Sequence, residues 1–393
     1  MNRALFLLIL AAAVVVPSGA GRAAPAGRAD TPETEPQRLS RILVPEIQRT
    51  MAEGRIPSCA VALVRGDAIV WTGAFGYSNL WARTPARPET VYLIGSTFKT
   101  MAMTGLVRLM DEGKFRLDDP VAPLLGDLKI RDEPPDRPVT FRHLLTHTAG
   151  LPSDFGPFLV WGDASPPSLA SYLQKSLKLK NPPLAMVEYS NIGFTLIAFL
   201  IEKLSGQPFR SYIISRVFEP AGLTDTGFIP RPDMVERLAV PYIVSVKTGA
   251  WTPVHWQKAS VWPAGIVYGT VLDQARWLIV NLNGGLAGGR RLVSEAAFAE
   301  IMTRQYSRFA GPIGHGWLNE TTGFGLAWWI SERNGAKLFA HSGSVSGYTA
   351  FLAGNLERRT GFAVLSNGNQ SHPYFYRLAL AALDALEPAP AAE

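Results

Sequence analysis

Short apolar stretches bounded by turn-forming residues lie near both ends of the chain and predict strands. Residues 58–64 and 68–76 are two apolar segments joined by Arg65-Gly66-Asp67. Glycine and aspartate are typical of tight turns, so this pattern predicts an antiparallel hairpin. The C-terminal part repeats the strand pattern four times, at residues 324–330, 337–340, 347–354 and 361–366.

Helical spacing separates these two strand-rich regions and also flanks them. A helix predicted to begin at Ser96 carries apolar residues at helical intervals and ends at Gly113. The clearest helix of the proline-rich middle spans residues 192–204 and is followed by Ser205-Gly206. Further helices are predicted at residues 39–51 and 372–386.

These elements predict an α/β (α+β) fold with a discontinuous sheet domain. Residues 39–95 and 263–390 would form a mostly antiparallel sheet flanked by helices, and residues 96–262 a mainly helical lobe inserted between them. Residues 25–38, rich in Ala, Pro, Gly and Arg, are predicted to be a flexible leader. A cleft between two lobes is a common location for an active site.

Residues 1–24 have the pattern of a signal peptide. Arg3 precedes an apolar run at residues 4–16, which is shorter than the roughly 20 residues of a membrane-spanning helix. Small residues follow, and cleavage is expected after Ala20 or Ala24. We therefore predict an exported protein, periplasmic or secreted, with no integral membrane segment after the leader. An uncleaved anchor is the less favoured alternative.

The composition is that of a compact globular protein. Hydrophobic residues make up 47% of the 393 positions and charged residues 18%. The formal net charge is +6, and the basic residues form no long run, so nucleic acid is not an expected partner. Cys59 is the only cysteine and lies in an apolar segment, which excludes an intramolecular disulfide and predicts a small buried filler.

The first candidate for chemistry is Ser96-Thr97-Phe98-Lys99, the only S-x-x-K of the chain. A serine and a lysine three positions apart on a helix lie on the same face. Serine becomes an effective nucleophile when a base takes its proton. Lysine can act as that base if its pKa falls from about 10.4 toward about 7–8, which burial favours. The pair therefore predicts a nucleophile, Ser96, and its base, Lys99.

The second candidate is Tyr189-Ser190-Asn191, directly before the apolar helix. A tyrosine can relay a proton to a leaving group, and an asparagine can hold both a substrate amide and the lysine. The same tripeptide occurs at residues 77–79, where the first hairpin ends, and there we interpret it as a turn.

The third candidate is His341-Ser342-Gly343-Ser344, on the predicted C-terminal strands. A strand at this place would supply the backbone N–H of Ser344, which together with the N–H of Ser96 would form an oxyanion hole. His341 would border the substrate. Lys247-Thr248-Gly249 is a competing candidate in a predicted hairpin turn, and the sequence alone leaves it open.

With these three motifs in this order, the chain resembles the serine hydrolases related to class C β-lactamases and D,D-peptidases over about residues 40–385. Connecting segments carry the resemblance further: residues 111–114 (DEGK), 117–120 (LDDP), 141–152 (FRHLLTHTAGLP), 218–226 (FEPAGLTDT), 263–265 (PAG) and 364–368 (VLSNG).

The resemblance implies a β-lactamase/transpeptidase-like fold and an acyl-enzyme on Ser96. Lys99 and Tyr189 would form the acid/base pair, while Asn191, His341 and the Gly343–Ser344 backbone would contact the substrate. No cofactor is implied. The substrate would be a small molecule or peptide: a D-amino-acid peptide, an acyl ester or a β-lactam.

Departures from the family pattern affect the expected substrate. Class C β-lactamases carry lysine at the position of His341, and a histidine is only partly charged at neutral pH. Residues 182–188 (PPLAMVE) lack the Pro-Gly turn that many members have before the Tyr-Ser-Asn motif. Substrate choice is expected to depend on the loops at residues 155–167 and 302–324.

Three alternatives remain at the level of sequence. The protein could be a true class C-type β-lactamase, or a penicillin-binding receptor that is acylated without turnover. A metal site is a third, because His143 and His147 are four positions apart. No further ligand cluster accompanies the two histidines, so no metal is predicted. The sequence leaves the oligomeric state undetermined.

Overall fold

The computed structural model describes most of the chain, namely residues 33–153, 159–160, 167–245, 247–255, 258–306, 322–369 and 371–387. The predicted signal peptide and the leader as far as residue 32 lie outside the described residues, as do the greater parts of the two substrate loops named above. Among the described residues, no helix is both long and apolar enough to cross a membrane.

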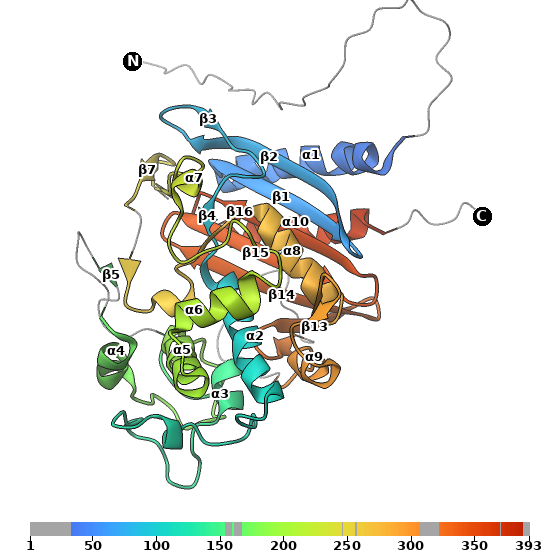
Figure 1. Cartoon of the computed structure of the whole chain (residues 1–393). Helices are drawn as coiled ribbons and strands as arrows, with labels where there is room; N and C mark the ends of the chain where they lie inside the picture. The colour runs from blue at the N-terminus through green and yellow to red at the C-terminus, as the bar shows by residue number, and fades with distance from the viewer. Residues whose placement is uncertain are drawn as a thin grey trace, which may run out of the picture.

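An eight-stranded antiparallel sheet forms the centre of the molecule (Figure 1). Its order is β12-β13-β14-β15-β16-β1-β2-β3, so strands from the two ends of the chain meet at the pair β1–β16. The strands are β1 (Ser58–Arg65), β2 (Ala68–Asn79), β3 (Thr84–Pro85), β12 (Gly323–Phe324), β13 (Trp329–Arg333), β14 (Ala336–Val345), β15 (Tyr348–Asn355) and β16 (Thr360–Ser366). The predicted antiparallel sheet built from both chain ends is confirmed.

Helices cover both faces of this sheet. Alternate residues of β1 point to opposite sides: Cys59, Val61 and Leu63 pack with α1 (Glu35–Gly54) and α10 (His372–Ala385). Ala60 and Ala62 pack on the other side with α8 (Val271–Leu282). Because both faces are covered, β1 is apolar on both faces from Cys59 to Val64. Burial raises the pKa of Cys59 to about 12, as expected for a buried filler.

The remaining helices lie mostly below the sheet in the view of Figure 1. They are α2 (Phe98–Asp111), α3 (Phe141–Leu145), α4 (Leu169–Ser176), α5 (Asn191–Ser205), α6 (Phe209–Ile213), α7 (Pro232–Val235) and α9 (Glu295–Ile301). Four two-stranded pairs complete the fold: β4 (Tyr92–Leu93) with β9 (Tyr268–Gly269), β5 (Leu159–Val160) with β8 (Lys258–Ala259), β6 (Tyr242–Val244) with β7 (Trp251–Pro253), and β10 (Leu286–Ala287) with β11 (Arg290–Arg291).

One hydrophobic core joins the sheet to the helices below it. It runs from Ala60 and Leu352 of the sheet through Phe98 of α2 to Phe194 of α5. The division into a sheet domain and a helical lobe therefore stays a prediction. The helix predicted from residue 39 begins earlier, inside the predicted leader, because the backbone N–H of Thr34 donates to Gln37 Oε1 at 2.9 Å and starts α1 at Glu35.

Two predicted strands differ in the structure. The segment at residues 324–330 is divided between β12 and β13, because Ala327 adopts φ +61° and its N–H donates to the Leu145 carbonyl outside the sheet. The strand predicted at residues 337–340 is longer and becomes β14. Its extension places His341 and Ser344 inside the strand, where their backbone conformation is extended.

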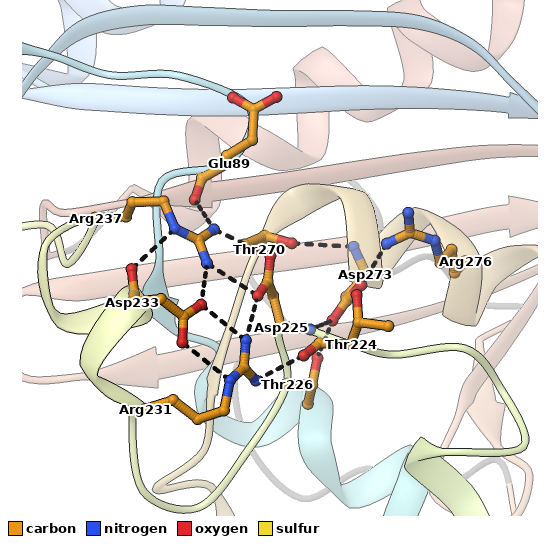
Figure 2. Close-up of polar contacts among 10 residues, drawn as sticks. All are labelled: Glu89, Thr224, Asp225, Thr226, Arg231, Asp233, Arg237, Thr270, Asp273 and Arg276. Carbon is orange, nitrogen blue, oxygen red and sulfur yellow. Dashed lines mark hydrogen bonds and ion pairs between the residues drawn. The ribbon is translucent and has the colours of Figure 1, made fainter.

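A network of charged and polar groups ties residues 224–237 to the start of α8 (Figure 2). Asp225 accepts hydrogen bonds from Arg231 and Arg237, both at 2.9 Å. The backbone N–H of Asp225 donates to Asp273 of α8, which is fully buried. Hydrogen bonds from Arg237 and then from Arg231 lower the pKa of the Asp225 carboxyl below its usual value.

We expect Asp225→Asn to destabilise the protein at neutral pH by about 1–2 kcal/mol, between the values typical of exposed and buried ion pairs. A carboxyl whose pKa is lowered by folding stabilises the protein above its unfolded pKa of about 3.9, and this contribution is lost as the pH falls through the folded pKa. Thermal unfolding should therefore separate wild type and variant at pH 7, and the difference should shrink below about pH 4. Asp233→Asn, at a more exposed partner of the same arginines, should have the smaller effect; an equal or pH-independent loss would contradict this account.

Candidate active site

Ser96 and Lys99 lie in contact at the start of α2. A 3₁₀ turn, Gly95–Thr97, leads directly into the helix, so the two side chains lie one turn apart. Lys99 Nζ is 2.9 Å from Ser96 Oγ, and the lysine is fully buried. The structure thus brings the predicted nucleophile and base together.

The amine of Lys99 also contacts two segments distant in the sequence. Lys99 Nζ donates to Asn191 Oδ1 at 2.8 Å and to the Ala264 carbonyl at 2.6 Å. It lies 5.0 Å from the centre of the Tyr189 ring. The second predicted motif therefore meets the first at the lysine. The Ala264 contact was not predicted, because a backbone carbonyl gives no residue-type signal, although residues 263–265 belong to the segments that carry the family resemblance.

Ser190 connects Tyr189 to the helix that follows. Its Oγ accepts the backbone N–H of Gly193 at 3.0 Å and so caps α5. The same hydroxyl donates to the Pro152 carbonyl at 2.6 Å. The cap places Asn191 as the first residue of α5, with its side chain at the lysine.

Close backbone contacts place β14 beside the serine. A Cβ on Gly343 would lie 2.1 Å from the Ile94 carbonyl oxygen, and one on Gly95 would lie 2.6 Å from the backbone nitrogen of Ser344. Gly95 also has φ +57°, a conformation that favours glycine. These glycines let the backbone of Ser344 lie against the residue preceding Ser96, as an oxyanion hole shared by the two would require.

His341 is buried beside Tyr189. Its ring stacks on Trp329 with centroids 5.4 Å apart, and its centroid is 6.2 Å from that of Tyr189. Nδ1–H donates to the Ser342 carbonyl at 2.6 Å. Burial, and to a smaller extent the charge that Lys99 carries in its protonated form, lower the pKa of His341 to about 3, against the opposing effect of the Ser342 carbonyl. The imidazole is therefore neutral at physiological pH, not partly charged.

The competing lysine lies in a different environment. Lys247 is exposed in the turn between β6 and β7, as the sequence predicted for this segment. The neighbouring Gly249 packs against the side chain of Arg55, at the end of α1. The second Tyr-Ser-Asn copy was predicted to be a turn, but its residues form the end of strand β2. Its asparagine caps the turn that follows: Asn79 Oδ1 accepts the backbone N–H groups of Trp81 and Ala82, both at 3.0 Å.

His143 in α3 and His147 just after the end of this helix both accept hydrogen bonds from backbone N–H groups. His143 Nδ1 accepts the backbone N–H of Thr140, which completes a cap of this helix. His147 Nδ1 accepts the backbone N–H of Ser190 at 3.1 Å. In the part of the chain that the structure describes, no group of three or more His, Cys, Asp or Glu residues could hold a metal ion. His147 is a residue of the site that sequence reasoning did not assign to it.

Comparisons with known proteins show the family to which the chain belongs. Residues 45–387 match the protein-family model described as Beta-lactamase. The chain is 27% identical to Penicillin-binding protein 4 of Amycolatopsis lactamdurans over 82% of this chain and 84% of that protein. It is 22% identical to Protein flp of Staphylococcus aureus (strain MRSA252), over 83% of this chain and 62% of that protein. It is 26% identical to Unguisins hydrolase ungD' of Aspergillus campestris, over 84% of this chain and 61% of that protein.

A solved structure shares both the fold and part of the sequence. The octameric penicillin-binding protein homologue from Pyrococcus abyssi superposes with a TM-score of 0.72 at 29% identity, covering 87% of this chain and 76% of that one. The family match spans the sheet, the helices below it and all three motifs. The chain belongs to the Beta-lactamase family of serine hydrolases.

Proposed function

We propose that the protein hydrolyses an amide or ester through an acyl-enzyme on Ser96. The observation that carries this proposal is the 2.9 Å contact between Oγ of the partly exposed Ser96 and the amine of the fully buried Lys99. The proposed chemistry needs no cofactor, because the nucleophile, the acid/base pair and the oxyanion donors are side chains and backbone amides of this chain. Residues 1–24 support export of the protein.

The contacts of Lys99 suit an uncharged amine acting as base. Such an amine has two hydrogens and one lone pair. It can donate its hydrogens to Asn191 Oδ1 and the Ala264 carbonyl, and direct its lone pair at the hydroxyl of Ser96. Burial disfavours the ammonium form, since it removes water from the charge. The amine then takes the hydroxyl proton as Ser96 Oγ attacks the substrate carbonyl.

The substrate oxyanion would be bound by the backbone N–H groups of Ser96 and Ser344. Each such donor contributes about 3–4 kcal/mol to lowering the barrier. The support for this step is the close approach of β14 to Gly95 described above. Gly343 matters here because a side chain at this position would push the strand away from Ile94.

Tyr189 would pass the proton to the leaving group. The support for this step is that the lysine amine lies 5.0 Å from the centre of the Tyr189 ring. The phenol would give its own proton to the departing oxygen or nitrogen and be reprotonated by Lys99, which holds the proton taken from Ser96. Water then enters, and the same Lys99–Tyr189 pair activates it to release the acyl group. Asn191 would position the substrate while its Oδ1 holds the lysine.

The neutral state of His341 bears on the substrate class. A neutral imidazole cannot hold a substrate carboxylate by charge, as a lysine in a class C β-lactamase does. We therefore propose a substrate that needs no charged partner for a carboxylate at this position, namely a small acyl ester or a D-amino-acid peptide whose carboxylate lies elsewhere, in preference to a β-lactam. A chromogenic cephalosporin, a p-nitrophenyl ester and a D-Ala-D-Ala peptide assayed side by side would rank the three. Steady hydrolysis of any of these substrates would support an enzyme. A single burst of product, equal to the amount of protein, would support a penicillin-binding receptor that is acylated without turnover.

Ser96→Ala should lower turnover at least about 10³-fold and abolish covalent labelling by an acylating inhibitor, because the variant lacks the attacking oxygen. The measurements are steady-state hydrolysis of the best of the three substrates and intact-protein mass spectrometry after labelling. Ser78→Ala, in the second Tyr-Ser-Asn copy, is the matched control and should be labelled like wild type. Labelling that persists in Ser96→Ala would remove Ser96 from this role.

Lys99→Ala should lower the acylation rate by about 10²–10⁴-fold, the range of general base catalysis. Lys99→Arg should be impaired as strongly, because an arginine keeps the positive charge but cannot release a proton near neutral pH. Stopped-flow acylation with a p-nitrophenyl ester measures both. An active arginine variant would show that charge, and not proton transfer, is what position 99 supplies.

His341→Ala should lower kcat/KM about tenfold, because it removes the ring packed between Trp329 and Tyr189. Lys247→Ala, in the exposed turn, should stay within about twofold of wild type. Since the pKa of His341 is about 3, the loss should be the same at pH 5.5 and pH 7.5. A larger loss from the lysine substitution would instead assign the third motif to residues 247–249.

A further inference from the structure

His147 holds the chain on both sides of Tyr189. Its backbone carbonyl accepts the N–H of Glu188 at 2.8 Å, and its side-chain Nδ1 accepts the N–H of Ser190 at 3.1 Å. These two donors belong to the residues immediately before and after the tyrosine. His147 thus fixes the backbone on both sides of Tyr189.

The imidazole of His147 also packs against the phenol ring. The two ring centres are 4.3 Å apart, with an angle of 33° between the planes. Phe194 and Phe324 lie 5.3 and 5.2 Å from the same imidazole and fill the space around it. The imidazole therefore limits the positions open to the Tyr189 ring as well as to its backbone.

The backbone of His147 is itself in an uncommon conformation. Its φ is +58°, in the left-handed region that residues other than glycine seldom adopt. Such a conformation persists at a buried residue only where the surrounding contacts hold it, and it is often found near functional sites. Here His147 directly follows the end of α3, where its N–H donates to the Leu144 carbonyl and the N–H of Thr148 donates to the His143 carbonyl, as at many helix ends. The contacts to the tyrosine segment add to this arrangement.

The protonation state excludes a direct role of His147 in proton transfer. Because Nδ1 accepts a hydrogen bond, the ring proton lies on Nε2. Burial, and to a smaller extent the charge that Lys99 carries in its protonated form, lower the pKa of His147 well below its usual value, so the ring stays neutral. Nε2 is buried and has no hydrogen-bond partner among the described residues. Among the described residues, the imidazole of His147 therefore makes its hydrogen bond to the backbone N–H of Ser190.

We propose that His147 is a positioning residue that orients the phenol of Tyr189 for proton transfer to the leaving group. The proposal rests on the proposed function, since His147 would act only through Tyr189. It has a consequence that a purely structural role lacks. Loss of the positioning should slow substrates whose leaving group needs a proton, and spare substrates whose leaving group departs as a stable anion.

Two substitutions separate the contacts of His147. His147→Phe keeps a ring beside Tyr189 but lacks the acceptor for Ser190. His147→Asn keeps a side-chain acceptor and tolerates the left-handed backbone conformation, but lacks the ring. Both are measured with an ethyl ester and a p-nitrophenyl ester of the same acyl group, with active sites counted by covalent labelling of Ser96.

For His147→Phe we expect a loss in kcat/KM of about 10–100-fold on the ethyl ester and less than about threefold on the p-nitrophenyl ester, within the range of general acid catalysis. His147→Asn should recover at least part of the ethyl ester activity. His143→Phe is the matched control: it removes a capping histidine on the same helix, and any loss should be equal on both esters.

A double variant tests whether His147 acts through the phenol. Tyr189→Phe should show the same dependence on the leaving group. His147→Phe combined with Tyr189→Phe should be no slower than Tyr189→Phe alone, because the group that His147 orients is already missing. If His147→Phe does not fold, His147→Gln, which moves the acceptor away from Ser190, takes its place in both measurements.

The outcomes distinguish the two proposals. Equal losses on the two esters, or losses that add in the double variant, would overturn the role of His147 while leaving that of Tyr189 intact. If Tyr189→Phe shows no dependence on the leaving group while Ser96→Ala is inactive, the acid role of Tyr189 fails and the inference on His147 fails with it.

Discussion

The burial of the Lys99 amine is the constraint on which the rest of the site depends. A buried amine needs polar partners, since an unsatisfied polar group in the interior is destabilising. Its partners here are Ser96, Asn191 and Ala264, which lie far apart in the sequence. Satisfying them requires α2, the start of α5 and the segment before α8 to converge on one point. The nucleophile, the phenol and the lysine are brought together by the same requirement.

Three glycines, which have no side chain, are as important to the candidate site as its reactive groups. Gly95, Gly265 and Gly343 bring three backbone segments closer than any Cβ would allow: a Cβ on Gly265 would lie 2.8 Å from the Gly95 carbonyl carbon. In the proposed mechanism, this close approach would let backbone amides, not side chains, face the reacting carbonyl. Backbone amides held in this way need no reorganisation during the reaction, which is the basis of oxyanion stabilisation.

Local chemistry allowed most of the elements to be predicted. The hairpin at Arg65-Gly66-Asp67, the long apolar helix and the glycine at its end follow from turn, periodicity and capping signals. The prediction of one continuous strand at residues 324–330 was wrong: the structure has two strands there, because the backbone N–H of Ala327 donates to the carbonyl of Leu145 in α3. That contact joins segments far apart in the chain and has no local signature. His147 was assigned no role for the same reason, since its partners come from residues 188–190.

The sequence by itself determined the family, the order of the three motifs and the pairing of Ser96 with Lys99, because a separation of three residues on a helix is a local geometry. Only the tertiary structure decided the environment of each group. It placed Lys247 in an exposed turn, and it made His341 neutral by burying the ring beside the lysine. The charge of a buried side chain depends on its desolvation, and the meeting of the three motifs depends on contacts between distant segments. No local pattern of residues encodes either.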